Sequence, residues 1–333
     1  MKAMPSATVR LLIVAVSAAV VLAAAGCGKG EPPASTPQFA SGAASSAVPQ
    51  PGSAQLGTAP SASAPAASSV PVPAGVTAGI VIYDRQAGAY VLQQKPSWRF
   101  RSASLVKLLI ALDYFWDKGP AYSVPAADKP KLQIMLQSSD DAAATGLWKA
   151  NGQRDIVTRM VQRLGLQDTE PPPVSQPGYW GYTAVSAADL VRVYQYILDK
   201  APPPVRDFII TNLHATTKCG TDHYDQSFGI PSVFKQPRSA KQGWSGFGDN
   251  PATPCVPNAD LPADAGPAFV PAADPNKPDM MGEVLHTTGT VGENDRYIVA
   301  VLSVHPDGTA FSKAATNLTK ITRSLPLPAS TKL

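Results

Sequence analysis

The chain is organised around a largely apolar run that extends from Phe100 to Trp116. Apolar residues surround the axis of a helix drawn over this run, and a helix that is apolar on all sides is a buried helix. Ser104 and Lys107 stand near its start, three residues apart, so their side chains share one helix face. We therefore expect Lys107 to be buried, although a lysine in a core is costly without partners.

Short runs rich in β-branched residues predict strands near both ends of the folded region. Residues 77–83 and 89–93 surround one turn, and residues 283–290 and 297–304 surround another, so each pair is expected to form an antiparallel hairpin. Residues 239–244 fit a further short strand.

Between these strands the periodicity is helical, and the breaks carry proline and glycine. The expected helices cover residues 131–137, 141–150, 154–164, 187–199 and 205–211, and a last helix covers 311–325. This order predicts an α+β fold. One antiparallel sheet, built from both chain ends and flanked by helices, would carry an inserted all-helical subdomain at about residues 117–214.

The N-terminus has the three regions of a secretory signal. Lys2 and Arg10 precede an apolar run over residues 11–25, and small residues lead to Cys27. A cysteine directly after small residues resembles a bacterial lipobox, so we expect a lipoprotein signal peptide over residues 1–26 and acylation of Cys27. An ordinary cleaved signal is the alternative. The acylated protein would be exported and lipid-anchored to the outer face of the bacterial cytoplasmic membrane.

Composition divides the rest of the chain. Residues 27–75 are mostly Ala, Ser and Pro with few large apolar side chains, which predicts a disordered tether. Residues 76–325 are enough for a folded domain with a large core, and residues 326–333 would form a C-terminal tail. Within the domain, the Pro-, Ala- and Asp-rich residues 248–279 are expected to form a surface excursion.

Charge and cysteine content limit the function classes. The 333 residues carry a net charge of +4, and removal of the signal peptide with its two basic residues leaves +2. No basic stripe appears, so nucleic acid is not an expected partner. With Cys27 acylated, Cys219 and Cys255 remain as a pair in an oxidising compartment, where we expect a disulfide. Two free or metal-binding thiols are the alternative, although no CxxC pattern or nearby histidine cluster favours it.

Ser104 and Lys107 also carry candidate chemistry, because they form the pattern S-x-x-K. Desolvation lowers a lysine pKa, and a neutral amine beside a hydroxyl can take its proton and make the serine a nucleophile. The pattern arises by chance roughly once in a chain of this length. A second match at residues 232–235 lies between two prolines and cannot open a long helix, so context favours Ser104.

Two further motifs follow in the sequence. Residues 138–141 (SSDD) precede a predicted helix and on their own would be an N-terminal cap. Residues 241–244 (KQGW) lie on a predicted strand and on their own would be an exposed basic edge. The chain has no G-x-S-x-G, HExxH, P-loop or Rossmann pattern, and its four histidines are scattered. We therefore expect neither a metal nor a cofactor.

Taken together, the order S-x-x-K, S-D-D, K-Q-G resembles the signatures S-x-x-K, S-D-N and K-T-G of the serine β-lactamase and penicillin-binding-protein superfamily. The chain looks closest to the class A β-lactamases. It also resembles a group of actinobacterial exported lipoproteins that carry KQGW and an H-T-T-G-x-V-G hairpin, here residues 286–292. The resemblance covers residues 76–325 and implies a β-lactamase/transpeptidase-like domain there.

The resemblance also implies roles for individual residues. Ser104 would be the acylated nucleophile, Lys107 its base, and Ser139 a proton relay to the leaving nitrogen. Lys241 would attract a substrate carboxylate, and the backbone N–H groups of Ser104 and Trp244 would form the oxyanion hole. The substrate-binding positions would be Asp141, Gln242, Gly243 and Trp244, with Gln242 in the place of a substrate-contacting Thr.

Three departures from the family pattern make acylation a firmer expectation than rapid turnover. Asp141 stands where the family has Asn; an ionised Asp cannot donate a hydrogen bond, and a carboxylate near Lys107 raises the lysine pKa. The loop that carries the deacylating glutamate of class A enzymes offers only Glu170, before the prolines. Ser139 also follows Ser104 more closely than in class A enzymes, so part of the helical region is missing.

We therefore expect a cell-envelope serine hydrolase or acyl-transferase that acts on β-lactams or D-Ala-D-Ala-type peptidoglycan peptides through a Ser104 acyl-enzyme. The alternative is a catalytically impaired lipoprotein of the same fold that binds cell-wall ligands or partners. A different assignment of the third motif, to residues 287–289 (TTG), stays open, although no lysine precedes it.

Overall fold

The computed structural model describes residues 69–256 and 282–333. The predicted signal peptide, Cys27 and most of the predicted tether lie outside these residues, as does much of the predicted surface excursion. Among the helices of the two described ranges, none has the length and apolar character needed to cross a membrane.

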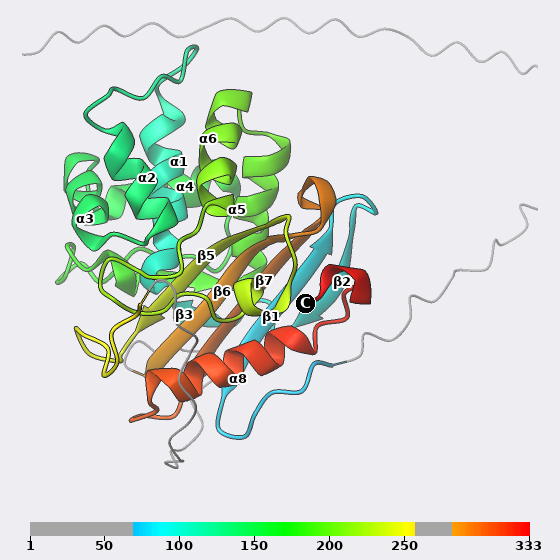
Figure 1. Cartoon of the computed structure of the whole chain (residues 1–333). Helices are drawn as coiled ribbons and strands as arrows, with labels where there is room; N and C mark the ends of the chain where they lie inside the picture. The colour runs from blue at the N-terminus through cyan, green and yellow to red at the C-terminus, as the bar shows by residue number, and fades with distance from the viewer. Residues whose placement is uncertain (1–68, 257–281) are drawn as a thin grey trace, which may run out of the picture. The chain divides into compact units, whose positions relative to one another are not determined.

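The sheet joins the two ends of the domain. Its five antiparallel strands have the order β2-β1-β7-β6-β5, so β1 and β7 pair along their full length at the centre. Figure 1 shows the cyan N-terminal strands beside the orange C-terminal ones. The strands are β1 (Thr77–Asp84), β2 (Ala89–Gln94), β5 (Arg238–Ser245), β6 (Glu283–Val291) and β7 (Tyr297–His305). β5 is an edge strand, and it carries the third motif.

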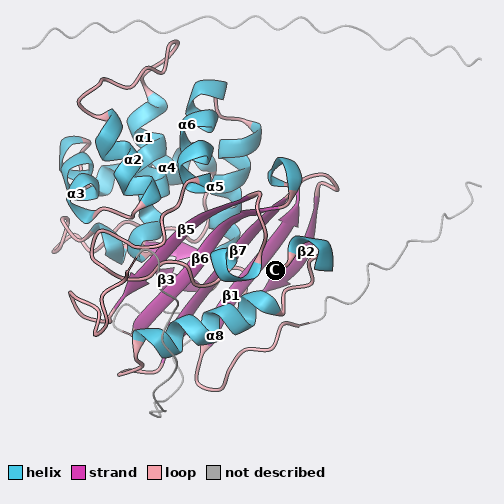
Figure 2. Ribbon diagram, in the orientation of Figure 1, coloured by secondary structure: helices cyan, strands magenta, loops and turns pink. Residues whose placement is uncertain are grey.

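Helices cover both faces of the sheet (Figure 2). On one face lie α7 (Ile230–Val233) and α8 (Phe311–Arg323). The other face packs against α5, which belongs to a helical region. That region comprises α1 (Lys107–Trp116), α2 (Lys129–Gln137), α3 (Asp141–Ala150), α4 (Arg154–Leu164), α5 (Ala187–Asp199) and α6 (Pro203–His214). Successive side chains of β1 point to opposite faces of the sheet and so enter two different cores. Val81 packs toward α5, while Ile80 and Ile82 pack toward α8. The predicted α+β architecture is confirmed.

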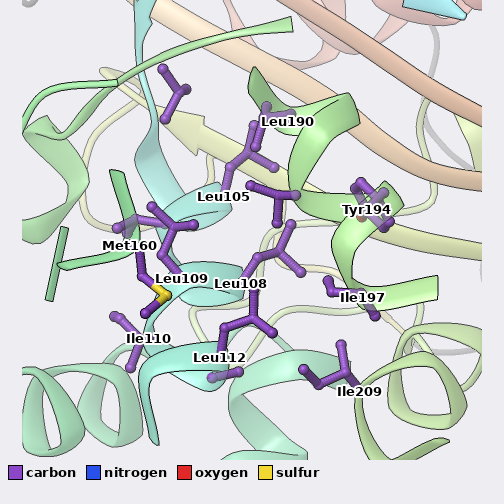
Figure 3. Close-up of a cluster of buried hydrophobic side chains, with 14 of the residues drawn as sticks. Leu105, Leu108, Leu109, Ile110, Leu112, Met160, Leu190, Tyr194, Ile197 and Ile209 are labelled. Carbon is purple, nitrogen blue, oxygen red and sulfur yellow. The ribbon is translucent and has the colours of Figure 1, made fainter. Parts of the chain in front are cut away.

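The axis of the helical region is α1, which is buried on nearly all sides. Its apolar side chains meet those of three surrounding helices (Figure 3). The labelled side chains of this cluster are Leu105, just before α1, Leu108, Leu109, Ile110 and Leu112 of α1, Met160 of α4, Leu190, Tyr194 and Ile197 of α5, and Ile209 of α6. The central position of this helix fixes the place of the residues at its N-terminal end.

Short elements connect these layers. β3 (Arg99–Arg101) and β4 (Ala184–Ser186) form a separate two-stranded sheet, so the insert expected to be all-helical contains one short strand. Four 3₁₀ turns complete the described elements: η1 (Ala103–Val106), η2 (Trp180–Tyr182), η3 (Glu293–Asp295) and η4 (Ala329–Thr331).

Element boundaries follow the sequence where caps define them. α3, α4 and α5 have the predicted bounds. α2 and α6 begin before their predicted starts because Pro130 and Pro203 lie in the first turn, where a helix accepts proline. The helix expected from Ser104 differs, since the 3₁₀ turn η1 comes first and α1 begins at Lys107.

The packed region extends beyond both ends of the domain expected over residues 76–325. Val70 lies in the predicted tether, yet it is buried, and its N–H donates to Gln94 Oε1 at 2.8 Å. In the predicted tail, Leu327 is buried and the N–H of Leu333 donates to the carbonyl of Val233 at 2.9 Å.

Candidate active site

The candidate nucleophile lies in the turn between β3 and α1. Ser102 anchors this turn, because its N–H donates to the carbonyl of Thr183 at 2.8 Å. Ala103 then adopts a φ of 46°, in the left-handed region that non-glycine residues rarely occupy, and the chain enters η1. Ser104 follows in this turn and is buried. A strained residue directly before a candidate nucleophile is typical of functional sites.

The predicted burial of Lys107 is confirmed, since its side chain is fully buried. Its Nζ lies 2.8 Å from Ser104 Oγ, 2.5 Å from the carbonyl oxygen of Ser139 and 2.6 Å from Asp141 Oδ1. Burial lowers the pKa of Lys107, and the carboxylate of Asp141 opposes this shift. The amine is therefore held against the hydroxyl of Ser104 by acceptors from a neighbouring segment.

That segment is the link between α2 and α3. Asp140 caps α3, because its Oδ1 accepts the N–H of Ala143 at 2.6 Å. Ser139, just before the cap, has a φ of 57°. Its Oγ lies 3.3 Å from Lys107 Nζ and 2.8 Å from Lys241 Nζ. The SSDD segment is thus both a helix cap, through Asp140, and a bridge between two lysines, through Ser139.

Lys241 reaches this bridge from β5. It is buried, and its Nζ donates to Ser139 Oγ and, at 3.2 Å, to the carbonyl of Gln242. Burial and the nearby charge of Lys107 hold the pKa of Lys241 well below its ordinary value. The structure therefore brings together Ser104, Lys107, Ser139 and Lys241, the four residues that the resemblance implies as catalytic.

Gln242 does not lie at this site. Neighbouring residues of a strand point to opposite faces. The side chain of Gln242 is fully buried, and its Nε2 donates to the carbonyls of Gln226 and Phe228 at 3.0 and 2.6 Å. The role expected for Gln242, in place of a substrate-contacting Thr, is therefore corrected: it is a buried structural residue.

Gly243 allows β5 to approach the nucleophile turn closely. A Cβ at this position would lie 3.0 Å from the carbonyl oxygen of Ser102 and 3.1 Å from Leu105 Cγ. This glycine is therefore needed for packing between the strand and η1. The family resemblance had implied a substrate-binding position for it. Trp244 comes next, and its indole Nε1 donates to Asp222 Oδ2 at 2.8 Å.

Asp222 was not predicted as a site residue. It belongs to the turn after Cys219, and the expected disulfide between Cys219 and Cys255 is confirmed, with Cα atoms 5.6 Å apart. Burial raises the pKa of the Asp222 carboxyl, which interacts electrostatically with Lys107 and Asp141. No sequence pattern marks Asp222, because only the fold brings this turn to the lysines.

The 3₁₀ turn η2 contributes an aromatic residue beside Lys107. The ring of Trp180 lies 4.8 Å from Lys107 Nζ, and its Nε1 donates to Thr145 Oγ1 at 3.1 Å. Glu170, the acid considered for deacylation, forms an ion pair with Arg99 at 2.6 Å. The carboxylate of Glu170 therefore pairs with Arg99 and is not among the groups that contact Lys107.

His286 supports the nucleophile turn from the sheet. Its Nδ1 accepts the N–H of Ser303 at 3.2 Å, so Nε2 carries the proton and donates to the carbonyl of Arg101 at 2.8 Å. Burial lowers the pKa of His286 to about 4, which keeps the ring neutral. The TTG segment that follows it lies on β6, an interior strand paired on both sides, so a ligand cannot align along its edge.

No cluster of three or more His, Cys, Asp or Glu side chains in residues 69–256 and 282–333 is arranged to hold a metal ion. The chemistry available at the site is that of a serine hydroxyl, two buried amines and the surrounding carboxylates.

Comparison with known structures places the fold. PBP-A covers 76% of this chain with a TM-score of 0.53 and 17% identity, and the class A β-lactamase of Mycobacterium abscessus covers 75% with a TM-score of 0.51 and 13% identity. The match extends over 89% and 93% of those two chains. This chain has the β-lactamase-like fold. The fold inferred from the three motifs is thereby confirmed.

Sequence comparison gives a narrower relation. No family model matches the chain. The mycobacterial protein LppW, named as an inferred lipoprotein in Mycobacterium tuberculosis and Mycobacterium bovis, is 36% identical over 175 residues. The match covers 51% of this chain and 54% of LppW, so the chain spans about half the length of the curated relatives it matches. At this level the β-lactamase-like fold is established and the activity is not.

Proposed function

We infer that the protein is a cell-envelope serine hydrolase or acyl-transferase that forms an acyl-enzyme through Ser104. The acyl donors would be β-lactams or D-Ala-D-Ala-type peptidoglycan peptides. The observation that carries this proposal is the 2.8 Å contact between Lys107 Nζ and Ser104 Oγ, with both side chains buried. A buried amine within hydrogen-bond reach of a serine hydroxyl is the arrangement that activates a serine as a nucleophile.

The contacts of Lys107 fit the neutral amine required of a base. A neutral amine has two N–H donors, which the carbonyl of Ser139 and the carboxylate of Asp141 accept. Its lone pair is then free to accept the hydroxyl proton of Ser104. Burial favours this neutral form because it lowers the lysine pKa.

The proposed reaction follows from these positions. Ser104 Oγ attacks the carbonyl carbon, its proton passes to Lys107 Nζ, and a bond forms between Oγ and carbon. When the bond from carbon to the leaving nitrogen breaks, Ser139 Oγ gives that nitrogen its proton and recovers one from Lys107 across 3.3 Å. The Nζ of Lys241, which donates to Ser139 Oγ at 2.8 Å, stabilises the oxygen during this transfer.

We expect the acyl-enzyme to be long-lived. Hydrolysis needs a base that activates water near Ser104. Beside Lys107 the loop supplies the indole of Trp180, and Glu170 is occupied by Arg99. The known structure of a mutant of PBP-A is described as an acyl-enzyme complex with penicillin G, which supports a persistent adduct as an outcome on this fold.

The proposed location rests on the N-terminus. The lipoprotein signal over residues 1–26 and the acylation of Cys27 lie outside the described residues. The inferred lipoprotein status of LppW supports an anchor for this chain. The tether would hold the domain off the membrane, within reach of the wall.

One observation favours a second candidate, a binding protein with impaired catalysis. Asp141 Oδ1 lies 2.6 Å from Lys107 Nζ, and this carboxylate favours the ammonium form, which cannot act as a base. Such a protein would bind cell-wall ligands at the same site without forming a covalent bond.

Labelling with a fluorescent penicillin, followed over hours on denaturing gels, separates these functions. We expect the wild-type protein to retain the label and a Ser104→Ala variant to remain unlabelled. Consumption of penicillin without a persistent label would identify a fast hydrolase and contradict the slow deacylation. If neither label nor consumption occurs with the wild-type protein, the binding protein becomes the better account.

A further inference from the structure

A turn clamped by the disulfide packs against the candidate active site. The N–H of Gly220 donates to the carbonyl of Tyr224 at 2.9 Å, and the N–H of Cys255 donates to the carbonyl of His223 at 2.7 Å. The N–H of Thr221 donates to the carbonyl of Ser138 at 3.0 Å, which joins the turn to the residue before Ser139. The turn is therefore fixed both to the disulfide and to the catalytic segment.

Asp222 projects from this turn with both carboxylate oxygens occupied. Oδ1 accepts the N–H of Tyr224 at 3.2 Å, and Oδ2 accepts the indole N–H of Trp244 at 2.8 Å. The approach is close enough to require Gly220, because a Cβ there would lie 2.5 Å from Asp222 Oδ1 and 3.0 Å from the Trp244 ring. An Asn side chain, with one oxygen, would leave one of the two N–H donors without its acceptor.

The carboxylate also acts on the two lysines. The charged groups that face Lys107 are Asp141 and Asp140 from the start of α3, Lys241 from β5, and Asp222. The negative charge of Asp222 raises the pKa of both lysines and so opposes the effect of their burial. Burial raises the pKa of Asp222 itself, while the N–H donors of Tyr224 and Trp244 favour its ionised form.

We propose that Asp222 is a positioning residue of the Ser104 site: through its hydrogen bond to the Trp244 indole it holds the end of β5, and with it the Trp244 backbone N–H, beside Ser104. This proposal rests on the proposed function, in which Lys107 is the base and the Trp244 backbone N–H is a donor of the oxyanion hole. Asp222 acts through these two residues without touching the substrate.

The test compares the wild-type protein with Asp222→Asn. Asp225→Asn is the matched control, because Asp225 carries the same charge in the same segment but pairs with Lys218, at 3.8 Å. Two quantities are measured across pH: the rate of acylation by a fluorescent penicillin, and the Nζ titration of Lys107 from the ¹³Cε shift of labelled lysine, assigned with Lys107→Arg.

We expect Asp222→Asn to move the Lys107 midpoint to lower pH by about half a unit to one unit, since a nearby negative charge is removed. The rising limb of the acylation profile should move by the same amount, and Asp225→Asn should move neither. Trp244→Phe, which keeps an aromatic ring but removes the indole N–H donor, should lower the acylation plateau about 3- to 10-fold.

Other results overturn the proposal. If Trp244→Phe leaves the acylation plateau unchanged and Asp222→Asn lowers the melting temperature but leaves the Lys107 midpoint in place, Asp222 has a structural role only. If the wild-type protein is not acylated, the proposed function fails on its own, and the lysine titration still decides whether Asp222 sets the charge of Lys107.

Discussion

The chain contains the pattern S-x-x-K twice, and the two copies differ in every property that matters for chemistry. Ser104 and Lys107 are buried, and Lys107 Nζ lies 2.8 Å from Ser104 Oγ. Ser232 belongs to the four-residue helix α7, and its hydroxyl donates to the carbonyl of Ser227 at 2.5 Å. Lys235 follows after α7 has ended and is exposed.

The difference between the copies comes from what surrounds each of them. α1 is buried along its length, so Lys107 loses its solvation and keeps only the partners that the fold supplies. α7 ends at Val233, before Lys235, so Ser232 and Lys235 do not share a helix face. The pattern therefore has chemical meaning only where burial perturbs the lysine and a neighbouring segment supplies its acceptors.

The largest predicted effect, and the strongest test of the difference between the two copies, concerns Lys107. Lys107→Met should lower the rate of acylation by about 10³-fold, because a base within hydrogen-bond reach contributes on this order. Its free energy of unfolding should stay equal or increase, since an apolar side chain replaces a buried amine. Lys235→Met, measured in the same assay, should change the rate less than about twofold. Equal losses in both variants would remove the distinction between the copies.

The next effect concerns the bridge between the lysines. Ser139→Ala should slow acylation by about 10- to 100-fold, because the hydroxyl that relays a proton from Lys107 to the leaving nitrogen is lost. Ser138→Ala is the matched control, since the Ser138 hydroxyl contacts Thr217 Oγ1 at 3.0 Å and neither lysine. Stopped-flow acylation with a chromogenic cephalosporin measures both. A similar loss in Ser138→Ala would assign the effect to the loop and not to the hydroxyl.

We expect the substitution Asp141→Asn to increase the rate of acylation. Its carboxylate raises the pKa of Lys107, so Asp141→Asn should lower that pKa and increase the fraction of free amine at neutral pH. Acylation at pH 7 should rise about 3- to 10-fold, with the rising limb of the pH profile moved to lower pH; the side chain of Asp141 is 62% exposed, which limits the effect. A slower Asp141→Asn variant would mean that the carboxylate takes part in the reaction.

The smallest effect concerns the start of β5, between Lys235 and Lys241. His214 Nδ1 donates to the carbonyl of Arg238 at 2.9 Å, and its Nε2 pairs with Asp295 Oδ1 at 2.9 Å. This partner raises the pKa of His214. The pair therefore stabilises the fold fully below the unfolded pKa of about 6.5, and this contribution is lost as pH rises through the folded pKa.

Melting temperatures between pH 5.5 and 8.5 test this effect. The wild-type protein should lose about 1 kcal/mol or less relative to His214→Gln as pH rises, in keeping with a partly exposed ion pair. Parallel curves for the two proteins would exclude His214 as the source.

Much of the fold could be predicted because the determining signals are local. Asp140 caps α3 and Gly165 ends α4 in the left-handed conformation, so periodicity and caps together gave their bounds. The entry to α1 was missed because the 3₁₀ turn depends on how β3 meets the helical region, which the sequence does not record locally.

Part of the site could also be predicted, because some of its residues belong to local sequence motifs. Ser139 and Lys241 belong to the second and third motifs. The order of the motifs along the chain predicts that both residues lie near Ser104. The orientation of Gln242 away from the site could have been predicted, because residues next to each other on a strand cannot face the same side. Asp222 could not, since only the folded turn brings it near Lys107.

The central claim is that Ser104, and not its counterpart Ser232, is the acylated residue. Intact mass of the purified protein after incubation with benzylpenicillin, followed by peptide mapping, tests this most directly. We predict one adduct of the mass of penicillin, located on the peptide that contains Ser104, absent from Ser104→Ala and unchanged in Ser232→Ala. An adduct that survives in Ser104→Ala, or no adduct in the wild-type protein, would contradict the account.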